Sequence, residues 1–279
     1  MRVVPPQVLV SRGPWASGAP RARASVERIL KRVTRFCVGS GFSRTMWLSV
    51  LVGVLAPGLH AQSATGTIRG HVVFTGKPPG NAVIRMGVDP KCSDLNAGKR
   101  VLEESALVTA DGSVGNVFVR LEGSFGRTAV PADPVVIDQR ACVYRPRVVG
   151  MRVGQTLQVR NDDDLLHNVH SSSAVGNSFN VGQPKAGIVY SFTPKAEEVM
   201  LTLGCDVHRW MTAYVGVVAH PYFAVSGNDG VFEIGKVPAG TYTIKTWHER
   251  FGETVKKVTV RPGATTTIDF SYSSLPRSG

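Results

Sequence analysis

The chain has 279 residues, which is enough for about two ordinary domains with additional segments. It is rich in Val, Gly and Thr and poor in helical periodicity, so we expect an all-β chain of short strands. The net charge is +12, but residues 1–61 contain nine Lys or Arg and one Glu, and residues 62–279 contain 23 against 19 Asp or Glu. The remaining balance of +4 gives no argument for a nucleic-acid partner.

Residues 1–61 are predicted to be a leader that contains a secretory signal peptide. The apolar run 46–56 follows an Arg-rich stretch, and small residues near Ala61 provide a plausible cleavage site. The run is too short to span a bilayer comfortably, and an uncleaved membrane anchor is the alternative. Because the stretch before it is long for a signal peptide, Met46 is a candidate for the true start. We therefore expect a periplasmic or secreted protein with no membrane span after cleavage.

Residues 62–133 form a predicted N-terminal β segment with hairpin patterns and no attached chemistry. The patterns are an apolar run at 68–74, a turn at 76–80 that contains two prolines, a second run at 82–86, and an Asp-Gly turn at 111–112 that leads into 116–121.

Residues 134–221 carry the strongest chemical signal, in two stretches. In the first, residues 156–161 alternate between apolar and polar as a strand does, and an acidic turn at 162–164 follows. The run His167-Asn168-Val169-His170 comes directly after this turn. The first stretch therefore presents imidazoles at the start of a strand or loop.

The second stretch ends in a cysteine. Residues 199–205 alternate as a strand whose apolar face carries the thiol of Cys205 inward. A short loop with His208 and Met211 follows, and a strand resumes at 214–218. Thiolate and thioether are soft donors that hold Cu(I), and imidazoles serve both copper oxidation states. The alternatives are that Cys205 is a buried small apolar residue, the histidines ordinary loop residues, and Met211 a core residue.

These motifs resemble those of the cupredoxin family, its amicyanin and plastocyanin members most closely, over about residues 134–220. The resemblance implies a Greek-key cupredoxin β-sandwich with one type I copper. It makes His167, Cys205 and His208 the equatorial ligands and Met211 the axial ligand. It also implies that Asn168 fixes the loops around the sulfur.

Three cysteines remain after the leader. With Cys205 as a copper ligand, Cys92 and Cys142 are left, and an oxidising compartment favours joining them in a disulfide. Free thiols are the alternative.

His170 is interpreted as a surface group or as an outer support of the site, not as a ligand.

Residues 222–279 have a different pattern. The segment 229–242 reads Asp-Gly-x-Phe-x-Ile-x-x-Val-Pro-x-Gly-Thr-Tyr. It resembles the carboxypeptidase regulatory-like, transthyretin-like β-sandwich, close to the carbohydrate-binding-like fold found beside rhamnogalacturonan lyases. This second, smaller sandwich lacks its opening strands, and residues 68–86 look like those strands. The hypothesis is a discontinuous domain with the copper domain inserted.

The expected function is that of an exported mononuclear blue-copper electron-transfer protein, not an enzyme. Electrons are expected to leave through a solvent-exposed edge of His208, while His167 is enclosed. Trp210 and Pro184 are candidates for an apolar patch where a redox partner docks transiently, and a core residue and a turn former are their alternative roles.

Two other functions stay open. One is a carbohydrate-binding or adhesion module in which the cupredoxin fold is only a scaffold, with Tyr242, Trp247 and Tyr272 as sugar platforms. The other is copper storage or delivery with the same ligands. The sequence indicates neither the redox partner nor the oligomeric state.

Overall fold

The computed structural model describes residues 64–273 of the chain. The predicted signal peptide, the candidate start Met46 and the cleavage site near Ala61 lie outside the described residues. Within residues 64–273, the structure contains no helix with the length and apolar character needed to cross a membrane.

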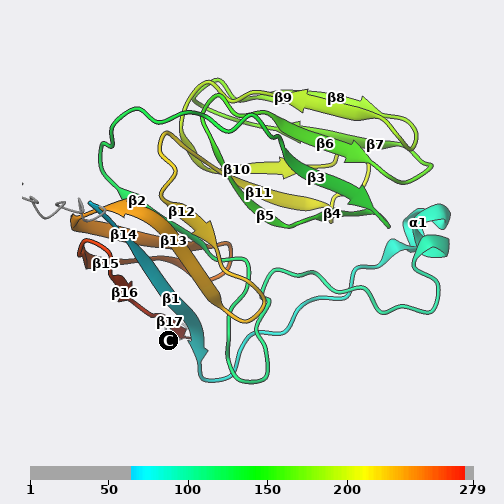
Figure 1. Ribbon diagram of the computed structural model, residues 1–279. Helices are drawn as coiled ribbons and strands as arrows, with labels where there is room; N and C mark the ends of the chain where they lie inside the picture. Colours follow the sequence, from blue (N-terminus) through cyan, green and yellow to red (C-terminus); the bar gives the residue numbers. More distant parts are fainter. Residues whose placement is uncertain (1–63, 274–279) are drawn as a thin grey trace, which may run out of the picture. The chain divides into compact units, whose positions relative to one another are not determined.

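The prediction of an all-β chain is confirmed (Figure 1). The strands are β1 (Thr65–Thr75), β2 (Phe118–Glu122), β3 (Val135–Arg140), β4 (Val143–Arg145), β5 (Val148–Arg152), β6 (Leu157–Asn161), β7 (His167–Ser171), β8 (Phe179–Gln183), β9 (Val189–Phe192), β10 (Glu198–Gly204), β11 (Thr212–Val218), β12 (Phe223–Val225), β13 (Val231–Pro238), β14 (Gly240–His248), β15 (Gly252–Val260), β16 (Thr265–Thr267) and β17 (Phe270–Ser273). The helical elements are the 3-10 turn η1 (Met86–Val88) and the short helix α1 (Pro90–Leu95).

Strands β3 to β11 form one β-sandwich. One sheet has the order β5-β11-β10-β7-β8 and the other has the order β4-β3-β6-β9. Connections such as β5–β6, β6–β7 and β9–β10 pass from one sheet to the other, as the expected Greek-key arrangement requires. We call this unit the first sandwich.

The core of the first sandwich follows from the period-two pattern of its strands. Leu201, Leu203 and Cys205 are buried on one side of β10 and its end, while Thr202 between them is exposed. Full burial of such a leucine stabilises the fold by about 2 kcal/mol. The sequence pattern thereby fixes which face of β10 carries the thiol.

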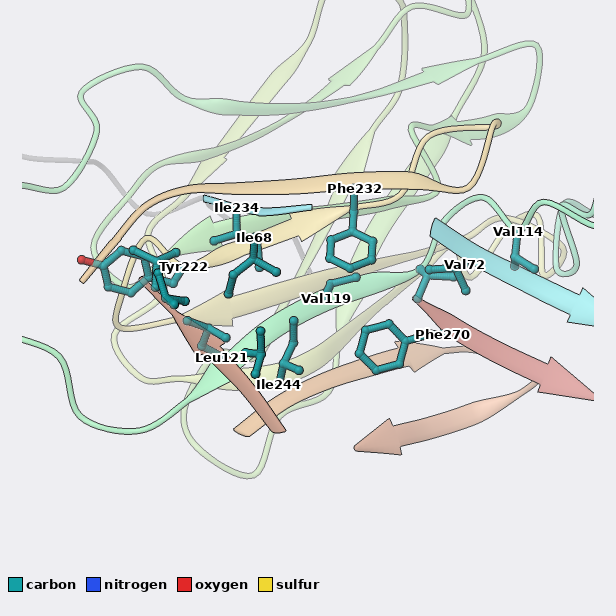
Figure 2. Packing of buried hydrophobic residues seen from close by; sticks show 14 of the residues in the cluster. Ile68, Val72, Val114, Val119, Leu121, Tyr222, Phe232, Ile234, Ile244 and Phe270 are labelled. Atoms are coloured by element: carbon teal, nitrogen blue, oxygen red, sulfur yellow. The ribbon is translucent and has the colours of Figure 1, made fainter. Parts of the chain in front are cut away.

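The remaining strands form the second sandwich. One sheet joins β13, β1 and β16, with β17 also paired to β1, and the other has the order β12-β2-β14-β15. Figure 2 shows Ile68, Phe232 and Phe270 of the first of these sheets packed against Leu121 and Ile244 of the second. Strands from before and after the first sandwich therefore share one core, which is the arrangement that a discontinuous domain requires.

Only part of the expected N-terminal hairpin forms. Residues 82–86 contain no strand, and Val83 makes only an isolated bridge to Leu102. Pro78 and Pro79 lack the N–H groups that would continue a ladder next to β1. The prediction of a strand at 82–86 was wrong, and the chain leads instead toward the first sandwich.

Residues 86–96, which contain η1 and α1, form a segment that we call the cap. Asp89 caps α1 because its Oδ1 accepts hydrogen bonds from the N–H groups of Lys91 and Cys92, and Pro90 occupies the first helical position. A disulfide between Cys92 and Cys142, with Sγ–Sγ 2.00 Å, ties the cap to the turn between β3 and β4. Figure 1 shows α1 beside the end of this hairpin.

The three aromatic residues considered as sugar platforms are not equivalent. Tyr272 is only 5% exposed and its hydroxyl pairs with that of Thr246, so its expected role as an exposed platform was wrong. Trp247 is half-buried and packs against Tyr214, with ring centroids 5.0 Å apart. Tyr242 is half-buried and donates its hydroxyl to the carbonyl of Pro238.

Candidate metal centre

His167 is the first residue of β7 and is completely buried. Its Nε2 lies 2.9 Å from Oδ2 of Asp163, in the acidic turn before the strand. The same carboxylate accepts hydrogen bonds from the backbone N–H groups of Ala141 and Cys142, at 2.7 and 2.8 Å. Asp163 therefore fixes the ring of His167 and the turn that carries the disulfide at the same time.

Cys205 follows directly after β10, and the loop that it opens ends where β11 begins at Thr212. The N–H of His208 donates to Sγ of Cys205 at 3.4 Å, and the N–H of Met211 donates to the carbonyl of His208 at 2.9 Å. Cys205 is 3% exposed, and His208 and Met211 are each 1% exposed. The loop is thus a closed turn that buries the side chains of Cys205, His208 and Met211.

Three of the predicted ligands converge. Nδ1 of His167 lies 3.0 Å from Nδ1 of His208, and Sγ of Cys205 lies 3.9 Å from the latter atom. The ligand atoms of His167, Cys205 and His208 all lie within 4.8 Å of one another. Tetrahedral metal bonds of about 2.0–2.1 Å to nitrogen and about 2.3 Å to sulfur would separate such atoms by roughly 3.3–3.6 Å. A metal ion could therefore bind all three with small shifts.

Met211 is placed less specifically. It is buried in the same cluster of side chains as Cys205, between the two sheets of the first sandwich. The side chain of Met211 therefore lies on the same side of the loop as that of Cys205. The role of Met211 as axial ligand stays a prediction.

Asn168 links both halves of the site. Its backbone N–H donates to Sγ of Cys205 at 3.4 Å, and its side-chain Oδ1 accepts from the N–H of Asp206 at 2.8 Å. The residue after one histidine thus holds the sulfur and the start of the ligand loop, which is how outer contacts orient metal ligands.

The charges of the site favour a deprotonated sulfur. Burial raises the pKa of the Cys205 thiol, but hydrogen bonds with His167 and from the N–H groups of Asn168 and His208 outweigh burial and bring this pKa below its ordinary value. Burial lowers the pKa of His167, but Asp163 and Cys205 together raise it above its ordinary value. A thiol with a lowered pKa is a ready metal ligand, since the thiolate is the form that binds.

The expectation that His208 lies at the solvent edge was wrong. Its Nε2 lies 3.1 Å from Oδ2 of Asp89 and 3.5 Å from Sγ of Cys92, and both residues belong to the cap. The hydrogen bond with His208 also lowers the pKa of Asp89 below its ordinary value. The disulfide to Cys142 holds this cover in place, so both imidazoles are enclosed.

Trp210 supports the cap. It is half-buried, its Nε1 donates to the carbonyl of Cys142 at 2.9 Å, and its ring lies 5.1 Å from that of His208. Trp210 thus joins the ligand loop to the turn that carries Cys142, and its docking role stays a prediction. Pro184 is exposed and follows the buried Gln183, and its docking role stays a prediction.

His170 lies at the surface of the site. Its Nδ1 lies 2.9 Å from Oδ1 of Asp206, and a third of its side chain is exposed. The structure places it outside the group formed by His167, Cys205 and His208.

Asp163 and Asp89, the two carboxylates that face the histidines, were not among the predicted site residues. Asp163 could have been found, because it lies in the acidic turn just before His167. Asp89 lies 119 residues before His208, and only its position ahead of Pro90, as a helix cap, marked it as a structured residue.

No protein-family model matches the chain, and no curated protein matches it. Solved structures that are similar to part of it include a purple cupredoxin from Nitrosopumilus maritimus, at 24% identity over 30% of this chain and 98% of the other, with a TM-score of 0.27. The amicyanin of Paracoccus versutus matches at 25% identity over 32% and 84%, with a TM-score of 0.28. The copper-containing nitrite reductase NirK of Thermus scotoductus SA-01 matches at 20% identity over 34% and 24%, with a TM-score of 0.29. At TM-scores this low, we draw no functional conclusion from these similarities.

Proposed function

We propose that this chain is an exported electron carrier with one copper ion held by His167, Cys205, His208 and Met211. The observation that carries the proposal is the approach of the two Nδ1 atoms to 3.0 Å beside the buried sulfur of Cys205. Export is proposed from the sequence of residues 1–61.

The two histidines are oriented in a way that suits a metal. Each Nε2 faces a carboxylate, Asp163 for His167 and Asp89 for His208, and therefore acts as the donor. The Nδ1 atoms then face each other as two acceptors, which repel unless a proton or a cation lies between them. Carboxylate partners of this kind fix the tautomer of metal-binding histidines and strengthen them as ligands.

The donor set favours copper over other metals. The thiolate of Cys205 and the thioether of Met211 are soft donors, and two imidazoles complete a set typical of blue-copper sites. Copper in such a site supplies one-electron chemistry by alternating between Cu(I) and Cu(II). The protein's own contribution is rigidity: strand ends, the turn at Asp163 and the disulfide-tied cap hold the ligands in one arrangement.

The groups that could bind a metal support a carrier with one centre. Among residues 64–273 there are three such groups, but two of them include Cys92 or Cys142, whose sulfur atoms are joined in the disulfide. The group with a free thiol is His167, Cys205 and His208. A redox protein that docks transiently is the partner we propose, since weak contacts of small area suit electron transfer.

The test is to add Cu(II) to the chain without residues 1–61 and to record a visible spectrum. We expect one bound copper and an intense blue or green colour from charge transfer between thiolate and copper. The variant Cys205→Ser should lose the colour and keep its β-sheet circular dichroism. A colourless wild type that takes up no copper would refute the proposal.

The covered position of His208 favours a second candidate, copper storage or delivery. An electron carrier with this ligand set was expected to expose one imidazole edge, and here Asp89 and the disulfide cover it. Reversible voltammetry of the copper-loaded protein would favour electron transfer. Irreversible voltammetry together with rapid loss of Cu(I) to a competing chelator would favour delivery.

A further inference from the structure

The ligand cluster is closed very differently on its two sides. On the side of His208, the cap is tied down by the disulfide, and both Cys92 and Cys142 are completely buried. Lys91 also donates its Nζ to the carbonyl of Asp164 at 3.1 Å, which holds the cap against the acidic turn. Because a covalent bond holds this cover, opening it needs reduction of the disulfide or unfolding of the segment.

On the other side, a groove of about 410 Å³ reaches the ligand loop. Cys205 and Met211, two of the proposed ligands, contribute to its lining. Both are almost fully buried, so only a small part of each faces the groove. Asp206 and Arg209 also line the groove and are exposed. Exposed loops of this kind open locally at low free energy.

His170 stands on the rim of this groove. Its Nδ1 lies 2.9 Å from Oδ1 of Asp206 but is buried and makes no hydrogen bond within the described residues 64–273, and a third of the side chain is exposed. The ring lies over Gly204, where a Cβ atom would come within 2.9 Å of Nε2. The missing Cβ atom of Gly204 leaves room for this ring next to Cys205, and the ring is part of the groove lining.

We propose that the groove is the loading port of the site, through which copper enters as Cu(I), with the imidazole of His170 as its first contact. This inference rests on the proposed copper function. Imidazole, thioether and thiolate all line the groove, and all three are ligands that Cu(I) accepts. No redox step is involved: the copper–sulfur bond forms as the Cys205 thiol releases its proton to solvent.

Two variants of the groove test separately whether the entering ion contacts His170 and whether it passes through the groove. His170→Phe keeps a ring over Gly204 and removes the nitrogen atoms, and Thr202→Trp fills the groove from an exposed position of β10. Thr265→Trp, at an exposed threonine of β16 in the second sandwich, is the matched control. Cys92→Ser/Cys142→Ser releases the cap without touching the groove.

Uptake of Cu(I), and of Ag(I) as a soft ion without redox chemistry, is followed by stopped flow with the apoprotein that lacks residues 1–61. Alkylation of Cys205 by a small thiol reagent gives a second readout without metal. We expect His170→Phe to slow uptake about tenfold and to leave alkylation unchanged. Thr202→Trp should slow both, and Thr265→Trp neither. The final copper stoichiometry should stay at the wild-type value in all of these variants.

The outcomes are distinct. If both groove variants load at the wild-type rate while release of the cap accelerates loading and alkylation, the port lies under the cap and the inference is overturned. The proposed function would survive that result. If the wild type binds neither ion, the proposed function fails and the loading port fails with it.

Discussion

The replacement Asp163→Asn tests whether one buried carboxylate organises the metal site. Asp163 is only 4% exposed, and its Oδ2 faces both the N–H of Cys142 and Nε2 of His167, at 2.8 and 2.9 Å. An asparagine that keeps its oxygen toward Ala141 turns an NH2 group toward these two donors. Leaving a buried polar group unpaired costs about 1–3 kcal/mol, so the lost hydrogen bond from the N–H of Cys142 predicts a loss of about 1–3 kcal/mol in the free energy of unfolding.

The same replacement should weaken metal binding through the tautomer of His167. An NH2 group at position 163 favours a proton on Nδ1 of His167, which is the nitrogen that faces His208. Loss of such an outer partner typically lowers metal affinity by about 10- to 100-fold. Urea unfolding of the apoprotein measures the first effect, and competition with a copper chelator measures the second.

Asp162→Asn is the matched control. Asp162 is the preceding residue in the same turn and pairs with the exposed Arg140 at 2.6 Å. Because Arg140 is exposed, this ion pair contributes little to stability, and it does not involve His167, Cys205 or His208. If Asp163→Asn unfolds at the wild-type urea concentration and binds copper with wild-type affinity, the organising role of Asp163 is refuted.

Three further predictions concern other parts of the molecule. Met211→Leu should keep the colour and raise the reduction potential measured by voltammetry, because the thioether stabilises Cu(II), and an unchanged potential would exclude Met211 as the axial ligand. Non-reducing mass spectrometry should find Cys92 joined to Cys142. Replacing both by serine should lower the free energy of unfolding by about 4 kcal/mol for a loop of 50 residues, and a loss below about 1 kcal/mol would contradict this role. Burial, with smaller effects of the nearby Arg147 and Arg250, lowers the pKa of His248 to about 4, so stability should be complete above about pH 6.5 and fall by roughly 3 kcal/mol as the pH decreases to about 4. His248→Asn should remove this part of the pH dependence in urea unfolding, and an unchanged slope would show that another group causes it.

The convergence of His167, Cys205 and His208 was predictable because it depends on local patterns. Alternation along residues 199–205 determines the face on which the Cys205 thiol lies, and spacing confines His208 and Met211 to the loop that follows. The position of His167 at the start of a strand is also a local property. These patterns place side chains on elements, and the two sheets of one sandwich then bring the elements together.

The cover over His208 was not predictable in this way. It depends on Asp89 and Cys92, which lie more than a hundred residues earlier in a segment without repeating apolar spacing. His208 was expected at the solvent edge because it lies in a short loop between two strands. Its burial is decided by a distant segment that the disulfide attaches, and no period of two or 3.6 encodes that contact.

The pairing of β2 with β12 has a consequence for synthesis on the ribosome. Phe118 of β2 lies opposite Val225 of β12, so the chain leaves the second sandwich and returns to it at neighbouring positions, about a hundred residues apart in sequence. Strands β1 and β2 therefore emerge long before their partners β13 and β14 are translated. The strands of the first sandwich are contiguous in the chain, so this sandwich can fold while the edges of β1 and β2 are still unpaired. Such edges invite pairing with other chains until β13 and β14 are available.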